Sequence, residues 1–464
     1  MKRRTAPALE PPLPTLLIRN ADVLVTMDEE RREIRDGGLF ARDGVIEQVG
    51  PTAELPRDAD LSLDMRGCVV TPGLVNTHHH MFQNLTRALP AGQDALLFGW
   101  LSAHYPLWMR MRPEHIRVSA MVALAELAES GCTTSSDHLY MFPNGARLDD
   151  SIEAAGEVGL RFHATRGAIS IGQSQGGVPP DAMVESEDAI LADTRRLIEA
   201  FDDPSPFSMT RVGVAPCSPF SVSRELMRDS AELARSYGVP LHTHLAENDE
   251  DVSYSLERFG VRPGEYAEEL GWCGPDVWHA HCVKLDPSEI DLFARTGTAV
   301  AHCPCSNMRL GSGIAPVRRM LATGVAVGLG VDGSASNDSG HLLNEARQAL
   351  LLQRVATGAA AMTARQALEL ATLGGARTLG RPDIGRLAPG KAADVAAFDV
   401  SGPAFAGAEW DPVAALVLCG PTRAATTIVG GRVVVEQGRC ITIDRARTLD
   451  SHAQLVRELA NGEA

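Results

Sequence analysis

The middle of the chain, about residues 71–380, alternates short apolar runs with amphipathic segments, and this alternation restricts the fold more than any other feature. Runs such as VPLHTHLAE and PDVWHAHCVKL have strand character, whereas SRELMRDSAELARSYG places its apolar residues at helical spacing. A chain that repeats strand and helix in this way builds a parallel sheet covered by helices. Eight such units can be followed. They predict an α/β fold, a (β/α)8 TIM-like barrel.

The two ends of the chain have a different texture. Residues 15–70 contain short apolar strands, with a hairpin turn expected where ARDG precedes VIEQVG, and residues 381–464 return to strands broken by Gly pairs, as in TTIVGGRVVVEQGRC. We predict that these segments form one small discontinuous β-sandwich, with a helix at the C-terminus. Residues 1–14 are positively charged and rich in proline, and we predict a disordered tail there.

The composition limits the classes of partner. Of 464 residues, 44% are hydrophobic, and the formal net charge is −16. Such a negative chain is a poor match for DNA, RNA or an anionic membrane. No apolar run reaches the roughly 20 residues of a membrane span, and no apolar stretch follows the basic start as in a secretory signal. With nine cysteines in no disulfide-like pattern, we expect a cytoplasmic protein that binds a small molecule. A homo-oligomer could assemble through the outer helices.

Polar residues gather where the predicted strands end. His78 and His80 lie two apart in PGLVNTHHH, His244 lies in HTHLAE, and Asp332 follows the buried run VAVGLGV. On a strand, residues two apart point to the same side, so His78 and His80 can share one ion. Because active sites of such barrels lie at the C-terminal ends of the strands, we expect these four side chains to meet. Three imidazoles and a carboxylate suit zinc and also accept iron.

Two further side chains at the same edge are candidates for proton transfer. Glu247 follows His244 by three residues, and a carboxyl group there could protonate a substrate; the alternative is a solvated loop acid. His281, in HAHC, could orient water or polarise a substrate; the alternative is a structural hydrogen bond. His242 is expected to be a core histidine that supports the ligands.

Two other histidines stay open, and one absence bears on the number of metal ions. His279 shares a strand side with His281, and His302 begins HCPCSN; neither is assigned to the metal. The fourth strand ends APCSPF and offers no lysine, the residue that commonly bridges two metals in such barrels. We therefore expect one divalent metal.

Taken together, these motifs resemble the amidohydrolase superfamily, in its branch of aminohydrolases with one metal. The resemblance includes IGRLAPGKAADVAAFDV near the C-terminus and spans nearly the whole chain. It implies that His78, His80, His244 and Asp332 bind the metal. It also implies that Asp332 relays a proton, that Glu247 acts as acid and base, and that His281 stabilises developing charge.

Within the branch, HHHMFQNLTRALPAGQDALLFGWL, GCTTSSDHLYMFPNG and ATRGAISIGQSQGGVPPD are similar to stretches of 8-oxoguanine deaminases. This likeness implies hydrolysis of 8-oxoguanine to urate and ammonia. Deamination of guanine or isoxanthopterin, and hydrolysis of an s-triazine, remain alternatives. A catalytically silent scaffold is disfavoured by the intact ligand set, and opening of a cyclic amide is disfavoured by the missing lysine.

Five residues are candidates for substrate contacts: Gln83, Arg166, Trp100, His138 and Cys217. Gln83 follows the HxH motif by three residues and could pair with an amide edge of a base, and Arg166 could bind a carbonyl oxygen. The alternative for Trp100 is core packing, and for Arg166 it is an ion pair that ties loops together.

Overall fold

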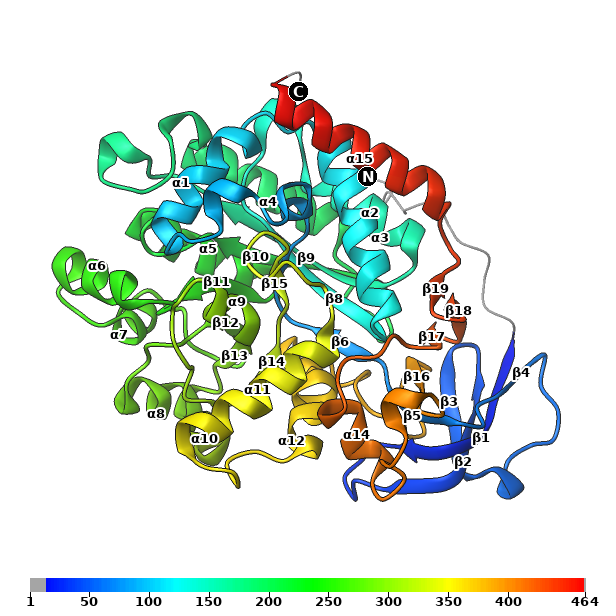
Figure 1. Cartoon of the computed structure of the whole chain (residues 1–464). Coiled ribbons are helices and arrows are strands. Elements are labelled where there is room, and N and C mark those ends of the chain that lie inside the picture. The colour runs from blue at the N-terminus through cyan, green and yellow to red at the C-terminus, as the bar shows by residue number, and fades with distance from the viewer. Residues whose placement is uncertain (1–13, 463–464) are drawn as a thin grey trace.

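The computed structural model describes residues 14–462, and its centre is a closed barrel of parallel strands joined in chain order (Figure 1). The eight strands are β6 (Leu74–Asn76), β8 (Cys132–Leu139), β9 (Arg161–Ala168), β10 (Thr210–Pro216), β11 (Leu241–Leu245), β12 (Val277–His281), β13 (Ala299–His302) and β14 (Val327–Leu329). Pairing of Leu329 with Asn76 joins the last strand to the first. The predicted (β/α)8 barrel is confirmed.

Helices surround this barrel and bury its strands on the outside. The longer helices are α2 (Pro113–Glu129), α3 (Leu148–Val158), α4 (Glu187–Phe201), α5 (Arg224–Tyr237), α6 (Asp249–Phe259), α8 (Pro287–Thr296) and α11 (Leu342–Thr357), and shorter ones are α7 (Pro263–Glu269), α9 (Pro304–Arg309), α10 (Val317–Thr323), α12 (Ala364–Glu369) and α13 (Gly375–Thr378). Helix α5 shows why the sequence has these boundaries. Ser223 accepts a hydrogen bond from the Leu226 amide at its start, and Gly238 adopts a φ of 66° at its end.

The two ends of the chain form a second body, seen at the lower right of Figure 1. Its strands are β1 (Thr15–Val25), β2 (Glu33–Arg42), β3 (Val45–Pro51), β4 (Leu61–Asp64) and β5 (Cys68–Pro72) from the N-terminal side, and β16 (Val395–Asp399), β17 (Thr426–Val429), β18 (Arg432–Glu436) and β19 (Arg439–Cys440) from the C-terminal side. The antiparallel pair β5–β16 joins the two sets. The two ends of the chain, for which a β-sandwich was predicted, therefore share one hydrogen-bonded sheet of nine strands.

Three further details bear on the sequence predictions. The hairpin turn expected in ARDG lies at Asp43 and Gly44, whose φ angles of 48° and 77° suit the tight turn between β2 and β3. The C-terminal helix is α15 (Arg445–Asn461), which packs along α2. Except for Pro14, the tail predicted over residues 1–14 lies outside the described residues. Within residues 14–462, no helix combines the length and the apolar character that a membrane crossing requires.

A short extension of the barrel prepares the functional site. Beyond β6 and β14 the chain forms β7 (His79–His80) and β15 (Asp332–Gly333), which pair in parallel with Asp332 opposite His79. Residues that follow the first and the last barrel strand are thereby held side by side above the C-terminal edge.

Candidate metal centre

The four predicted ligands meet at the C-terminal edge of the barrel. Nε2 of His78 lies 3.2 Å from Oδ1 of Asp332, and Nε2 of His80 lies 3.4 Å from the same oxygen. Nε2 of His80 is 3.0 Å from Nε2 of His244. Donor atoms that crowd together at such distances repel one another unless a proton or a cation lies between them, so this arrangement suits a bound metal ion.

The protonation of His78 is fixed by a chain of hydrogen bonds that starts at a backbone carbonyl. The Trp278 carbonyl oxygen lies 2.9 Å from Nδ1 of His242, so this nitrogen carries the proton and Nε2 of His242 is an acceptor. His78 Nδ1 donates to that Nε2 over 2.8 Å. The lone pair of His78 Nε2 then faces Asp332, and this buried nitrogen has no hydrogen-bond partner among the described residues. The predicted supporting role of His242 matches this arrangement.

The other two histidines are oriented by carbonyl groups in the same way. Nδ1 of His80 donates to the backbone oxygen of His138 over 2.7 Å, and Nδ1 of His244 donates to the backbone oxygen of Cys217 over 2.5 Å. In each ring the Nε2 lone pair is left to point into the cluster. Protein metal sites have this construction, in which a second hydrogen bond fixes the tautomer of each ligand.

Burial keeps these rings neutral, which metal binding requires. It lowers the pKa of His244 to about 3 and depresses the pKa values of His78 and His80 as well. Burial alone would raise the pKa of Asp332. The close contact with His78 and the other nearby imidazoles outweigh burial and hold that pKa well below its usual value. The site therefore presents neutral nitrogens and one ionised oxygen.

Asp332 is held on its far side by two hydroxyl groups. The hydroxyl groups of Ser306 and Ser336 both donate to Oδ2, the latter over 3.1 Å, which leaves Oδ1 facing the histidines. The backbone of Asp332 has a φ of 59°, and Ala246 and His281 have φ angles of 50° and 71° at neighbouring strand ends. Such left-handed conformations cost of the order of 1–3 kcal/mol each in residues with a Cβ, and they concentrate at functional sites.

Glu247 and His281 lie together beside the cluster. Oε2 of Glu247 is 3.6 Å from Nε2 of His281, and Nδ1 of His281 is 2.9 Å from Oδ1 of Asn307. Burial, together with the charge of Asp332, raises the pKa of Glu247 well above its usual value, so its carboxyl group can hold a proton at neutral pH. A buried acid next to an ionised one is the usual arrangement for general acid–base catalysis.

A cavity opens over these groups. Three of the five predicted substrate contacts line it, namely Gln83, Trp100 and Cys217. Oε1 of Gln83 is buried without a hydrogen-bond partner among the described residues. Gly333 makes room for this amide, because a Cβ at residue 333 would lie 1.7 Å from Oε1. Neither lysine nor arginine occurs among the described residues that line the cavity.

The other two predicted contacts lie outside the cavity lining. The guanidinium group of Arg166 binds Glu185 at 2.7 Å and 3.1 Å and Asp193 at 3.3 Å, so its placement corresponds to the ion-pair alternative. His138 lies behind the ligands, stacked on His244 with ring centroids 5.0 Å apart, and donates from Nε2 to the Ala215 carbonyl oxygen.

The open histidines and the residues missed by the sequence predictions are also placed. His279 lies in the core and donates from Nε2 to the Trp272 carbonyl oxygen over 2.9 Å. His302 is buried near His281 with both ring nitrogens unpaired among the described residues. The sequence predictions missed Tyr105 and Tyr140 in the cavity wall. Tyr105 belongs to α1 (Leu97–Trp108), and only the aromatic character of that segment could have suggested its role.

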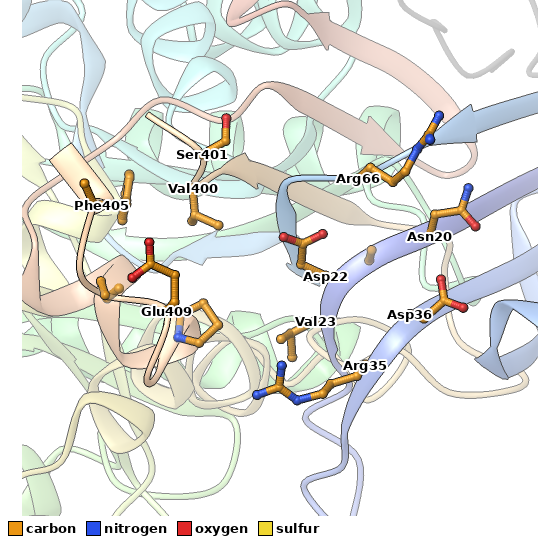
Figure 2. Close-up of a pocket in the computed structure, with 15 residues that line it drawn as sticks. Asn20, Asp22, Val23, Arg35, Asp36, Arg66, Val400, Ser401, Phe405 and Glu409 are labelled. Carbon is orange, nitrogen blue, oxygen red and sulfur yellow. The ribbon is translucent and has the colours of Figure 1, made fainter. Parts of the chain in front are cut away.

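A larger hollow lies elsewhere, at the sheet formed by the chain ends. Figure 2 shows its wall, with Asp22, Arg35 and Arg66 on one side and Phe405 and Glu409 on the other. Its lining contains no histidine or cysteine among the described residues, and Arg66 is already bound to Asp64 at 2.9 Å. Size alone does not make this groove the reaction site, because it lacks converging unpaired groups.

The donor set defines the site as a divalent-metal centre of hydrolytic type. The ligand atoms of His78, His244, His281 and Asp332 lie within 4.8 Å of one another, and an overlapping set contains His78, His80, His138 and His244. Neutral imidazoles with one carboxylate form the usual first sphere of catalytic zinc, and His78 Nε2 is left for such an ion.

Comparison with known proteins agrees with this class. Residues 69–434 match the model of the Amidohydrolase family, and the chain belongs to this family. It is 44% identical to an 8-oxoguanine deaminase of Pseudomonas aeruginosa, over 92% of this chain and 95% of that protein. It is 39% identical to an isoxanthopterin deaminase from an unknown prokaryotic organism, over 91% of this chain and 93% of that protein.

A solved structure gives the same result for the fold. The zinc complex of an atrazine chlorohydrolase from Arthrobacter aurescens superposes with a TM-score of 0.91 at 35% identity, covering 95% of this chain and 100% of that one. With this family, these relatives and this site, the protein is an aminohydrolase that acts on the C–N bond of a cyclic amidine.

Proposed function

We propose that the protein removes the exocyclic amine of 8-oxoguanine by hydrolysis and releases urate and ammonia. The observation that carries this proposal is a single cavity in which the histidine cluster and Asp332 lie together with Glu247, a carboxyl group whose pKa burial raises well above its usual value. The identity of 44% to a protein named 8-oxoguanine deaminase supports the choice of substrate.

The walls of the cavity favour a neutral planar base over a nucleotide. A phosphate group would need cationic partners, and the described lining has neither lysine nor arginine. The unpaired Oε1 of Gln83 can accept a hydrogen bond from a ring N–H group, which guanine-type bases offer. Trp100, Tyr105 and Tyr140 supply aromatic surface for the ring.

The metal we propose is a single zinc ion, held by His78, His80, His244 and Asp332. A divalent metal at this site lowers the pKa of water to about 7, so that the nucleophile is available at neutral pH. The zinc complex of the chlorohydrolase, which has the same fold, supports the identity of the metal.

The side chains around it then move the protons. Nδ1 of His281 donates a hydrogen bond to Oδ1 of Asn307, so Nε2 of His281 can accept a hydrogen bond from the attacking water and orient it. Asp332 takes one proton from this water as its oxygen adds to C2 of the purine, and Glu247 gives its proton to the adjacent ring nitrogen. Asp332 passes its proton to the amine, the C2–N bond breaks, and the remaining hydroxyl proton returns to Glu247. One water is consumed and one ammonia leaves. Proton transfers of this kind contribute about 10²–10⁴-fold to the rate.

The proposal also covers the cellular compartment of the enzyme and the class of its partners. All nine cysteines are free, which supports a reducing compartment, and we place the protein in the cytoplasm. Its net charge of −16 supports a small-molecule substrate rather than nucleic acid or membrane.

The test is ammonia release by zinc-loaded protein from 8-oxoguanine, with guanine, isoxanthopterin and a chloro-s-triazine in parallel and metal-free protein as control. We expect 8-oxoguanine to be turned over with the highest kcat/KM. Preference for isoxanthopterin or guanine would keep the chemistry and overturn the substrate. Chloride release from the triazine without any ammonia from the purines would overturn deamination itself.

A further inference from the structure

A carboxylate outside the cavity connects the two loops that carry the reacting groups. Glu345 lies on α11 and is fully buried, yet both of its oxygens are bonded to uncharged N–H groups. Oε1 accepts a hydrogen bond from Nδ2 of Asn337 over 2.8 Å, and Oε2 accepts one from the Cys305 amide over 3.1 Å. Burial raises the pKa of this carboxyl group to about 7, and holding such a group in the interior without a cation is costly, so its presence here needs an explanation.

The Cys305 amide lies in the first turn of α9, the short helix that serves both Asp332 and His281. Cys305 is followed directly by Ser306, whose hydroxyl donates to Oδ2 of Asp332, and by Asn307, whose Oδ1 is bonded to Nδ1 of His281. A shift of the Cys305 amide would therefore move both supporting side chains, because they are the next two residues of one rigid turn.

The other donor, Asn337, belongs to the loop that carries Asp332 itself. Nδ2 of Asn337 also donates to the Val331 carbonyl oxygen over 2.7 Å, one residue before Asp332. In the same loop, Ser336 donates to Oδ2 of Asp332. Glu345 thus binds the Asp332 loop through Asn337 and the turn that carries Ser306 and Asn307 through the Cys305 amide.

We propose that Glu345 is a positioning residue, which joins these two loops so that Asp332 and His281 keep the spacing needed for metal binding and proton transfer. It touches neither the substrate cavity nor a metal ligand, and it acts only through Asn337 and Cys305. Supporting groups of this kind commonly change metal affinity or activity by 10–100-fold when they are altered.

The variant Glu345→Gln tests this role at nearly constant volume. One oxygen becomes an NH₂ group, which must face either the Cys305 amide or the Asn337 NH₂ group, so one donor is placed against another. Turning the Asn337 amide over would relieve one clash but bring its oxygen against the Val331 carbonyl. We expect kcat to fall about 10–100-fold with KM within about twofold, and metal to be released about 10–100-fold faster.

The matched control is Glu289→Gln. Glu289 is also buried and also accepts backbone hydrogen bonds, from Gly264 and Asp286 at 2.7 Å each, and it is paired in addition with Arg262 at 2.9 Å. It lies on α8, away from the cavity lining. We expect this variant to lower the melting temperature at least as much as Glu345→Gln, with kcat and the rate of metal release unchanged.

The kinetic readout rests on the proposed function and uses whichever compound of the substrate panel is turned over. The metal readout needs no substrate: Co²⁺-loaded protein is mixed with a chelator, and its visible spectrum and the rate of Co²⁺ loss are recorded. A changed spectrum and faster loss in Glu345→Gln, but not in Glu289→Gln, would support the proposal even if no panel compound reacted.

A third variant covers the case in which Glu345→Gln does not fold. Asn337→Leu removes the same connection from the other side, and it should reproduce the loss of kcat and the faster Co²⁺ release. If both variants fold, the kcat of the double variant should be no lower than that of the less active single variant, because both substitutions break the same connection. Wild-type kcat and Co²⁺ release in either single variant, or equal losses in Glu289→Gln, would overturn the proposal.

Discussion

Two polar regions of the molecule differ in how their charged groups are satisfied. At the barrel edge, His78, His80 and Asp332 are at most 4% exposed, and their free atoms converge on one point. In the groove of the terminal sheet (Figure 2), Asp22, Arg35 and Asp36 are exposed to solvent.

The difference shows which observation indicates function. Polar groups in the open groove cost little, since water solvates them, and they need no ligand. Unpaired nitrogens and a carboxylate at the buried edge would be unfavourable without an ion or substrate, and the surrounding carbonyl groups point each ring inward. Burial together with convergence, rather than the size of a hollow, identifies the site.

The largest difference is expected between one carboxylate at the barrel edge and one in the groove. Asp332→Asn removes a ligand and the proton acceptor, and we expect kcat to fall by at least about 10²–10⁴-fold. Asp22→Asn in the groove keeps the oxygen that accepts from the Gly67 amide, so activity and stability should stay near wild type, within about 0.5 kcal/mol. Steady-state kinetics and thermal melting check both. Substantial activity in Asp332→Asn, with metal content confirmed, would remove that residue from its role.

A smaller effect should come from the residue that orients His78. His242→Phe keeps the ring that stacks on Trp278 at 4.5 Å but removes the acceptor for His78 Nδ1. We expect zinc affinity to fall about 10–100-fold, measured by competition with a chelator. His279→Gln, a change on the neighbouring strand β12, should leave zinc affinity unchanged. Equal zinc affinity in His242→Phe and wild type would contradict the role of His242 in fixing the tautomer.

The smallest effect concerns stability as a function of pH. Burial lowers the pKa of His279 to about 4, against roughly 6.5 in an unfolded chain. Because the unfolded state binds the proton more readily, this contribution to stability is complete above about pH 6.5 and is lost as the pH falls toward 4. Between pH 6 and 5, the free energy of unfolding of metal-free His279→Gln should decline less steeply than that of metal-free wild type. The expected difference between the two slopes is about 1.4 kcal/mol per pH unit.

Urea unfolding of metal-free wild type and His279→Gln at pH 7.5, 6 and 5 measures this difference. The metal-free form is used because zinc binding would add its own dependence on pH. Parallel declines in the two proteins would show that His279 does not contribute to the acid sensitivity.

The barrel, and the meeting of the four polar side chains at its edge, could be predicted because both follow from local rules. Alternation of strands and helices defines the barrel, and the period of two along a strand places His78 and His80 on one side. Because the C-terminal ends of the parallel strands meet at one edge of the barrel, His244 and Asp332 come to the same edge. None of these steps needs knowledge of distant packing.

The substrate wall could be predicted only in part, since it depends on how loops fold back over the barrel. Arg166 lies in β9, as expected, but its partners Glu185 and Asp193 come 19 and 27 residues later, and they hold its guanidinium group away from the cavity. Tyr105 reaches the cavity because α1 lies over the barrel mouth, which no periodicity in the sequence reveals. The hydroxyl groups of Ser306 and Ser336 behind Asp332 depend likewise on tertiary contacts.

The pairing of β7 with β15 also has a consequence for the order of folding. His79 pairs with Asp332, and Oδ1 of Asn76 accepts a hydrogen bond from the amide of Val331, which lies 255 residues further along the chain. Contacts between such distant segments form slowly, because a long loop must close first. The proposed metal ligands come from both sides of this seam, so a nascent chain cannot assemble the proposed site until its last barrel strand has emerged and docked. The rate of metal binding during refolding would therefore report the rate at which the barrel closes.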